Sequence, residues 1–415
     1  MTARRRVAAG LLLFLSACGG RAAPVAVPGP HAAPVPHDTL DAPGAPGSWG
    51  PSGALDASGR RAAPRSADEA ATRRAGYFFR GLPYGSDQVV GPLGLLLNKG
   101  FATAQWEANG RKIFDYPYGW RAVWRSVSAP GHTVRDHGGW KAVLTWNFIP
   151  FTGEGLNSWQ WYPNYFGHIL EGGIAYRQLA EWFRYQGVPA PSWMAASLTY
   201  LTAIVNEAYE VRPYRPWVDE HGSANTMVDL YFFDPVSILL FSHDGAARFF
   251  SETLHANTWP HQAAIVANGG RLMNNGQQVV MKLPLFFTER ASFFFKSGMG
   301  VQLGLAHHLS GGYDLSWGLG GEAWSQFIDP ETRTERARID VSAGMWLDRG
   351  GSLLAGIQWY RKTDRRFTLN VYPGVLPGPG SDLGFWVVVD TGGRPFLGLS
   401  YAKALGVGTG LRLGG

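Results

Sequence analysis

From residue 277 onward, apolar and polar side chains alternate along the chain, and this period of two constrains the fold more than any other feature. Eight runs show the alternation, most of them separated by Gly- or Pro-rich breaks: residues 279–288, 292–307, 313–327, 333–347, 352–362, 366–375, 383–389 and 396–404. Ile339, Val341 and Met345 share one face of the fourth run, whereas Arg338 and Asp340 share the other. Consecutive antiparallel strands of this length predict an up-and-down β-barrel or a large curved sheet of about eight or more strands, mostly C-terminal.

Whether this sheet contacts lipid is left open by alternation alone. Several runs reach about ten residues, which is the length of a tilted strand that crosses a membrane. The chain has 16% charged residues, 55 Gly and 17 Trp, whereas an average soluble domain has about 25% charged residues. We therefore expect the β region to contact a bilayer. The alternative is a soluble sandwich or lipocalin-like barrel, whose strands alternate in the same way.

Before the alternating region, residues 163–257 have the apolar period of helices. The pattern predicts about four of them, over residues 163–187, 191–210, 234–240 and 244–255. Gly187 and Pro189 mark the end of the first, and Asp234 before Pro235 has the pattern of an N-cap at the start of the third. We predict an α+β protein, with this helical subdomain joined to an antiparallel β region over residues 278–415.

Residues 76–162 are aromatic-rich and broken by Gly and Pro, and they predict a mixture of strands and loops. Residues 103–108 and 141–151 are the candidate strands. The second of them alternates from Trp140 and ends at Pro150, as expected for a strand that a proline interrupts.

The N-terminus has the features of a bacterial secretory signal. Arg4, Arg5 and Arg6 precede an apolar run that ends in Leu-Ser-Ala-Cys at Cys18, and this run is about half as long as a membrane-spanning helix. The pattern resembles the lipobox of bacterial lipoproteins, in which the cysteine is acylated and becomes the first residue. Because Cys18 is the only cysteine of the chain, we expect a lipid anchor there and a location in the outer membrane of the cell envelope. The alternative is an ordinary cleaved signal in which Cys18 is incidental.

Removal of the signal peptide, residues 1–17, changes the charge of the remaining chain. Three arginines are lost, so 34 basic residues remain against 31 acidic ones and the formal net charge falls from +6 to +3. Because the positive and negative charges of the remaining chain nearly cancel, we predict no nucleic-acid partner. Residues 18–75 are rich in Ala, Pro and Gly and predict a disordered tether between the lipidated cysteine and the folded body.

Two sets of polar residues on the first two predicted helices form a recognisable pattern. They are Asn164, His168, Gly172 or Gly173 and Tyr176 on the first helix, and Asn206, Glu207 and Glu210 on the second. Over about residues 140–255 the chain resembles a family of uncharacterised bacterial envelope proteins with this pattern. It departs from the family in having Ile169 where a proline commonly follows the histidine. The resemblance implies an envelope location and an architecture of helices plus strands, and it brings no assigned activity.

The same helices carry the candidate chemistry. His168 and Glu171 are three residues apart on the first helix, and Glu207 and Glu210 have the same spacing on the second. A short turn between antiparallel helices would bring the histidine and up to three carboxylates together. Such a cluster suits a divalent metal or acid–base catalysis. The alternative is a buried hydrogen-bond network, with Asn164, Asn206 and Tyr176 as further members, that holds the helices together.

Two classes of function remain as hypotheses. The first is a structural or binding lipoprotein of the bacterial outer membrane with a barrel-like body, which needs no cofactor. The second is an envelope enzyme that acts on lipid or cell-wall substrates, with His168, Glu171, Glu207 and Glu210 as its catalytic residues. The sequence has no Gly-x-Ser-x-Gly elbow, no phosphate-binding loop and no His-Glu-x-x-His motif.

Overall fold

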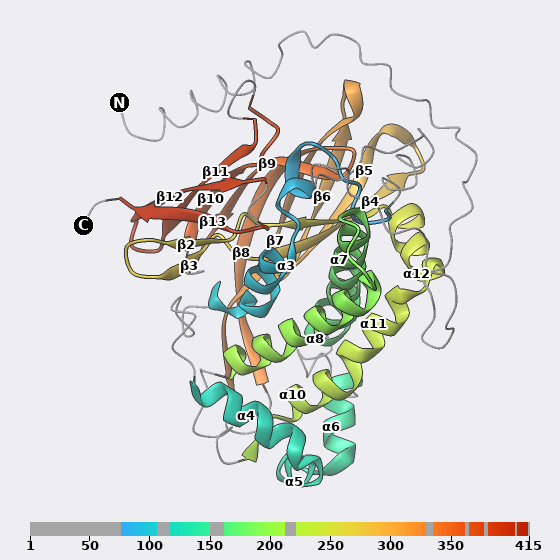
Figure 1. Ribbon diagram of the computed structural model, residues 1–415, viewed down its shortest axis with the longest axis vertical. Helices are drawn as coiled ribbons and strands as arrows, with labels where there is room; N and C mark the ends of the chain where they lie inside the picture. The colour runs from blue at the N-terminus through green and yellow to red at the C-terminus, as the bar shows by residue number, and fades with distance from the viewer. Residues whose placement is uncertain are drawn as a thin grey trace, which may run out of the picture. The chain divides into compact units, whose positions relative to one another are not determined.

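The computed structural model describes residues 76–105, 117–149, 162–211, 221–328, 335–361, 365–376, 381–402 and 405–413. All of them belong to one compact unit of the chain, Leu40–Gly415. Within these residues, helices come first in the sequence and a large curved sheet follows (Figure 1), so the predicted α+β class is confirmed. Cys18, the signal peptide and the predicted tether lie outside the described residues.

The described residues form one sheet of 13 strands. The strands are β1 (Ala256–Pro260), β2 (Ala264–Val266), β3 (Arg271–Met273), β4 (Gln277–Leu285), β5 (Thr288–Ser297), β6 (Gly300–His308), β7 (Tyr313–Ile328), β8 (Glu335–Arg349), β9 (Ser352–Tyr360), β10 (Arg365–Val371), β11 (Leu383–Asp390), β12 (Pro395–Tyr401) and β13 (Gly408–Arg412). From β4 to β13 each strand pairs with the next one along the chain, in antiparallel orientation. The predicted run 292–307 is divided between β5 and β6, and β1, β2, β3 and β13 were not predicted.

The two edges of the sheet belong to one bent hairpin. β1 pairs with β4, whereas β2 pairs with β3 and, in parallel orientation, with β13. Both antiparallel pairings keep a single register, with Pro260 opposite Gln277 and Ala264 opposite Met273. Between them the hairpin bends, and the amide of His261 donates to the carbonyl of Gly276 at 2.8 Å. The sheet therefore curves until its first and last strands meet at this hairpin, although it is not closed by a continuous ladder.

The helical part of the described chain contains short and long elements. They are η1 (Gly85–Val89), α3 (Pro92–Leu95), η2 (Leu96–Gly100), η3 (Ala102–Gln105), α4 (Pro117–Ser128), α5 (Pro130–Asp136), α6 (Gly139–Phe148), η4 (Pro163–Gly172), α7 (Gly173–Tyr185), α8 (Pro191–Glu210), α10 (Ala224–Val228), η6 (Asp229–Phe233), α11 (Asp234–Ser242), α12 (Asp244–Arg248) and η7 (Phe249–Thr253), with η8 (Ser310–Gly312) between strands. The four predicted helices are confirmed as η4 with α7, α8, α11, and α12 with η7. Four segments, η2, η4, η6 and η7, are π-helical.

Three local predictions are wrong. The described part of the candidate strand 141–151 lies in helix α6 and the residue after it, and residues 150–151 lie outside the described residues. The buried residues Val143 and Asn147 lie one turn apart in this helix; Val143 packs with residues of α10 and η6, and Asn147 accepts a hydrogen bond from Asn164 of η4. The candidate strand over residues 103–108 begins within the short helix η3, Ala102–Gln105, and its residues 106–108 lie outside the described residues. Asp234 is not an N-cap, because Phe233 before it is already helical, with φ −67° and ψ −45°. In each case packing against distant residues outweighs the local pattern.

The concave face of the sheet is filled by small, aromatic and charged side chains. Phe294 lies between Trp259 and Trp346, with ring centroids 6.2 and 5.2 Å apart. The ammonium group of Lys296 is fully buried and donates to Oε1 of Glu322 at 2.8 Å. Lys296 and Glu322 are thus paired and withdrawn from solvent, as buried charges must be.

The outer face has the opposite character. One row of side chains, from β4 to β13, is apolar at every position: Leu283, Phe293, Leu305, Trp317, Met345, Ile357, Leu369, Val387, Leu397 and Leu411. None of these ten side chains is buried. A neighbouring row, from Phe295 through Leu303, Leu319, Ala343, Trp359, Phe367 and Val389 to Pro395, is apolar as well. We call these two rows the outer apolar face.

Within the described residues, helices cover one end of the outer face. Val279 and Met281 of β4 are buried in a cluster with Leu170 of η4 and Ile174 of α7. On β5, Phe295 contacts Phe166, with ring centroids 5.9 Å apart. The helical layer therefore lies over β1, β4 and β5, and it leaves large side chains of β6, β7 and β8 exposed; Leu319 is 58% exposed.

Candidate functional site

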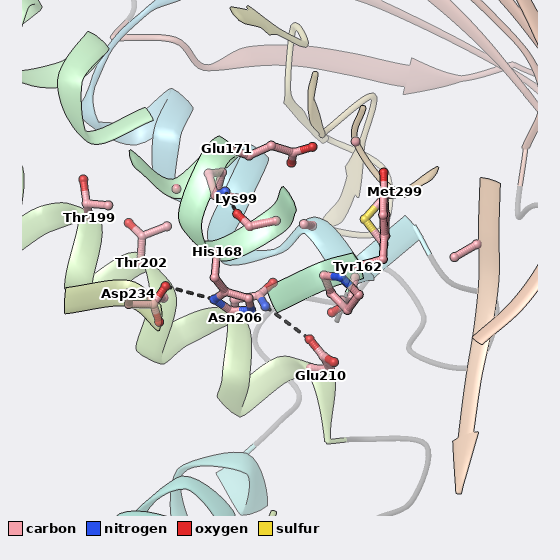
Figure 2. Close-up of a pocket in the computed structure, with 18 of the residues that line it drawn as sticks. Lys99, Tyr162, His168, Glu171, Thr199, Thr202, Asn206, Glu210, Asp234 and Met299 are labelled. Atoms are coloured by element: carbon pink, nitrogen blue, oxygen red, sulfur yellow. Dashed lines mark hydrogen bonds and ion pairs between the residues drawn. The ribbon is translucent and has the colours of Figure 1, made fainter. Parts of the chain in front are cut away.

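A cavity of about 140 Å³ lies between the helical layer and the end of the sheet (Figure 2). Its walls come from η2, η4, α8 and the turn between β5 and β6. The polar side chains that line it include Lys99, His168, Glu171, Asn206, Glu210 and Asp234. This volume is below the roughly 300–1,000 Å³ of pockets that hold drug-sized ligands, so the cavity suits a small group.

His168 stands at the cavity wall and is held by a carboxylate on another helix. Its Nδ1 lies 2.9 Å from Oδ1 of Asp234, the first residue of α11, so the two side chains share a hydrogen bond. Burial lowers the pKa of His168, but the carboxylates of Asp229, Asp234 and Glu207 outweigh burial and raise this pKa well above its usual value. The ring is thereby fixed in orientation, as expected for a histidine with a carboxylate partner.

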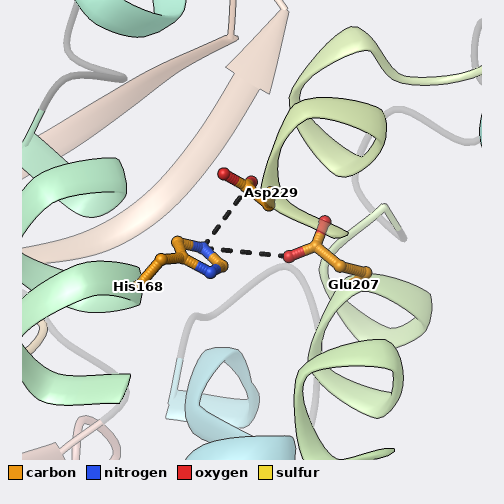
Figure 3. A group of neighbouring side chains, drawn as sticks. All are labelled: His168, Glu207 and Asp229. Carbon is orange, nitrogen blue, oxygen red and sulfur yellow. Dashed lines mark ion pairs between the residues drawn. The ribbon is translucent and has the colours of Figure 1, made fainter. Parts of the chain in front are cut away.

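Two further carboxylates lie beyond the imidazole (Figure 3). Oδ2 of Asp229 is 3.6 Å from Nε2 of His168, and Oε1 of Glu207 is 3.9 Å from the same nitrogen. Glu207 on α8 is 1% exposed, and Asp229 at the start of η6 is fully buried. Burial, followed by the charges of Asp229 and Glu210, raises the pKa of Glu207 well above its usual value. The prediction that the helical hairpin brings His168 and Glu207 together agrees with this geometry.

Glu171 does not join this cluster, although it lines the same cavity. Figure 2 shows its carboxyl group directed away from His168, and it accepts a hydrogen bond from Ser297 Oγ of β5 at 2.6 Å. Burial raises the pKa of Glu171, and Lys99 acts in the opposite direction. Three-residue spacing fails here because η4 is π-helical, which changes how side chains align along the helix.

The other predicted polar residues are distributed over three places. Asn206 and Glu210 meet at the cavity, where Nδ2 of Asn206 donates to Oε2 of Glu210 at 3.3 Å. Asn164 donates to the backbone of Asn147 at 3.0 Å, so it joins η4 to α6. Tyr176 is buried in the hydrophobic cluster of α7. A single network of Asn164, Asn206 and Tyr176 is therefore not formed.

Sequence reasoning missed Asp229 and Asp234 as partners of His168. Asp234 is 66 residues from His168 in the chain, and no local spacing connects them. The one available signal was the pair of acids five residues apart, Asp229 and Asp234, in an otherwise apolar stretch. The Asp-Pro dipeptide at 234 instead favoured the interpretation as an N-cap.

Comparisons with protein-family models, with curated proteins and with solved structures find no match to this chain. None of the helices in the described part of the chain combines the length and the apolar character needed to span a bilayer. The outer apolar face and the cluster around His168 are therefore the two features of the molecule from which a function can be inferred.

Proposed function

We propose that the protein is a lipoprotein of the bacterial outer membrane, with a structural or binding role, whose outer apolar face contacts the acyl chains of the bilayer. The observation that carries this proposal is the apolar row that runs unbroken from Leu283 on β4 to Leu411 on β13. Monomeric soluble proteins rarely leave a contiguous apolar patch larger than a few hundred Å² in water.

The distribution of charge supports lipid as the occupant of this face. On β5 and β7 the charged residues Lys296 and Glu322 point into the concave side and pair there. On β8 the outward positions from Ile339 to Leu347 are all apolar, and they extend over roughly 27 Å of strand at 3.4 Å per residue. This length is close to the apolar band of about 25 Å in membrane barrels.

Cys18 supplies the second part of the proposal. An acylated Cys18 would hold the N-terminus at the membrane, and a single acyl chain gives only marginal binding whereas several chains anchor firmly. The outer apolar face would then be a second, independent attachment. The two contributions are separable by experiment because they lie on different residues.

The experiment is fractionation of cells that produce the protein, followed by gel mobility of the outer-membrane fraction before and after boiling. A sheet folded in the bilayer resists detergent until it is heated, so we expect a heat-dependent shift in mobility. The Cys18→Ser variant is the matched control, because it lacks only the lipid and should keep the shift. A variant that folds and remains soluble in buffer without detergent would contradict contact between the sheet and lipid.

A second candidate is the envelope enzyme, with its chemistry at the cavity. Two observations favour this candidate. The side chains of Lys99, Glu171 and Glu210 line the same small cavity. Asn206 lines it too, and its Oδ1 is buried and has no hydrogen-bond partner among the described residues. Burial lowers the pKa of Lys99, which is the shift that prepares an amine for proton transfer. The test is mass spectrometry of lipids and cell-wall fragments from cells that produce either the wild type or Glu210→Gln. Identical products would exclude this candidate.

A further inference from the structure

Three potential ligand atoms surround one point in the helical layer, next to the cavity. They are Nε2 of His168, Oδ2 of Asp229 and Oε1 of Glu207, and the groups lie within 4.8 Å of one another (Figure 3). Hydrogen bonds between nitrogen and oxygen are about 2.7–3.2 Å long. The 3.6 and 3.9 Å separations from Nε2 are therefore too long for direct hydrogen bonds.

The same separations suit a bridging ion. A tetrahedral zinc ion with bonds of about 2.1 Å holds its ligand atoms about 3.4 Å apart. Small rotations of the Asp229 and Glu207 side chains would bring their oxygens to this spacing. Histidine nitrogen and carboxylate oxygen are both ordinary zinc ligands.

Burial supplies a second and independent observation. Glu207 is 1% exposed, and its Oε1, the atom nearest to His168, has no hydrogen-bond partner among the described residues. A buried carboxylate oxygen without a donor is costly unless a cation or a proton compensates it.

Asp234 completes the arrangement from the other side of the imidazole. Its carboxylate is 2.9 Å from Nδ1 of His168, so Nδ1 keeps its proton, and a metal ion that takes the place of the proton on Nε2 would meet the Nε2 lone pair between Asp229 and Glu207. Histidine ligands of metal ions usually have such a partner, which fixes the tautomer and raises the basicity of the ligand.

We propose that His168, Glu207 and Asp229 bind one divalent transition-metal ion, with Zn²⁺ as the ion that suits this ligand set, and that Asp234 positions the imidazole. The ion joins three helical segments, η4, α8 and η6, beside the cavity. This site does not depend on contact between the sheet and the bilayer, so either proposal can fail without the other.

The test uses the full chain purified in detergent, stripped with a chelator, dialysed and titrated with Zn²⁺. We expect one tightly bound zinc per chain by elemental analysis after gel filtration. Glu207→Gln and Asp229→Asn should lose this ion, and Asp234→Asn should bind it about 10- to 100-fold more weakly. Glu171→Gln is the matched control, since it changes a buried carboxyl on the same helix as His168 that lies outside the cluster, and it should bind as the wild type does.

Circular dichroism of each variant shows whether a loss of zinc reflects a loss of fold. If the ligand variants do not fold, the visible absorption spectrum of the cobalt-substituted wild type tests the proposal instead. An intense absorption indicates a four-coordinate site and supports the proposal. The weak absorption of six-coordinate aqueous cobalt would overturn it. Absence of stoichiometric zinc in the wild type, or equal binding by the wild type and folded Glu207→Gln and Asp229→Asn, would also overturn it. In that case the cluster is a proton-sharing network between helices.

Discussion

The ion pair inside the curve of the sheet provides a quantitative test of which face is the interior. Lys296 is fully buried and Glu322 is 4% exposed, and their charged atoms are 2.8 Å apart. Lys296→Met removes the cation and leaves a buried carboxylate without it, which costs about 3–5 kcal/mol of unfolding free energy for pairs of this kind. Glu322→Gln should cost a similar amount, because it leaves the buried ammonium group without its counter-ion.

The double variant should cost less than either single change, since it removes both charges. A double-mutant cycle then gives a coupling of at least about 3 kcal/mol. The measurement is urea unfolding of the purified protein in detergent, followed by tryptophan fluorescence. Lys141→Met, at an exposed position on α6, is the control and should change the free energy by less than about 0.5 kcal/mol. Additive effects below about 1 kcal/mol each would show that water reaches Lys296 and would refute the concave interior.

Three further predictions concern the outer apolar face, the anchor and the N-terminal segment. In vesicles, Leu319→Arg should lower the free energy of unfolding by about 2–4 kcal/mol. The control Thr391→Arg, in the exposed turn after β11, should leave this free energy nearly unchanged. Equal losses for the two variants would contradict the proposed membrane contact. Cys18→Ser should abolish incorporation of labelled palmitate yet leave the protein in the membrane fraction, and its release in soluble form would show that the lipid is the only anchor. Burial raises the pKa of Asp87 to about 6, so between about pH 4 and 6 this carboxyl ionises in the unfolded chain but stays protonated in the folded one. The free energy of unfolding should therefore fall by roughly 3 kcal/mol over that range and stay at the lower level above it. Asp87→Asn should remove this pH dependence in urea titrations, and an unchanged slope would argue against it.

The long strands were predictable because their faces differ so strongly. From Tyr313 to Arg349, β7 and β8 alternate between outward apolar residues such as Trp317 and inward small or charged residues such as Glu322. A shift of one residue in the register would exchange the two faces, so the alternation alone determines which side chains point inward, whatever the packing around them. β2 and β3 are three residues each, which is too short for a period of two to be distinguished from chance.

Helix α6 shows where local pattern was insufficient. Trp140 to Pro150 alternates as a strand does, but Val143 and Asn147 also have helical spacing. The choice depends on α10 and η6, whose Met227, Val228 and Phe233 cover Val143. Only the tertiary contact decides between the two periods, and it comes from residues far along the chain.

The candidate site was predictable in part for the same reason. His168 and Glu207 lie on two helices joined by a short turn, so hairpin geometry places them together. Asp229 and Asp234 arrive from η6 and α11, and no sequence spacing relates these elements to η4. Glu171 was misplaced because the π-helical turn directs it to Ser297 on the sheet.

A fluorescent probe on the outer apolar face would report directly whether this face lies in the bilayer. In a Cys18→Ser background the chain has no other cysteine, so Leu319→Cys and Thr391→Cys each provide a single labelling site. After reconstitution into vesicles that contain lipids with a quencher on the acyl chain, we expect strong quenching of the probe at position 319, where Leu319 is 58% exposed, and weak quenching at position 391. Equal and weak quenching at both positions would show that the face is not in the bilayer and would contradict the proposed function.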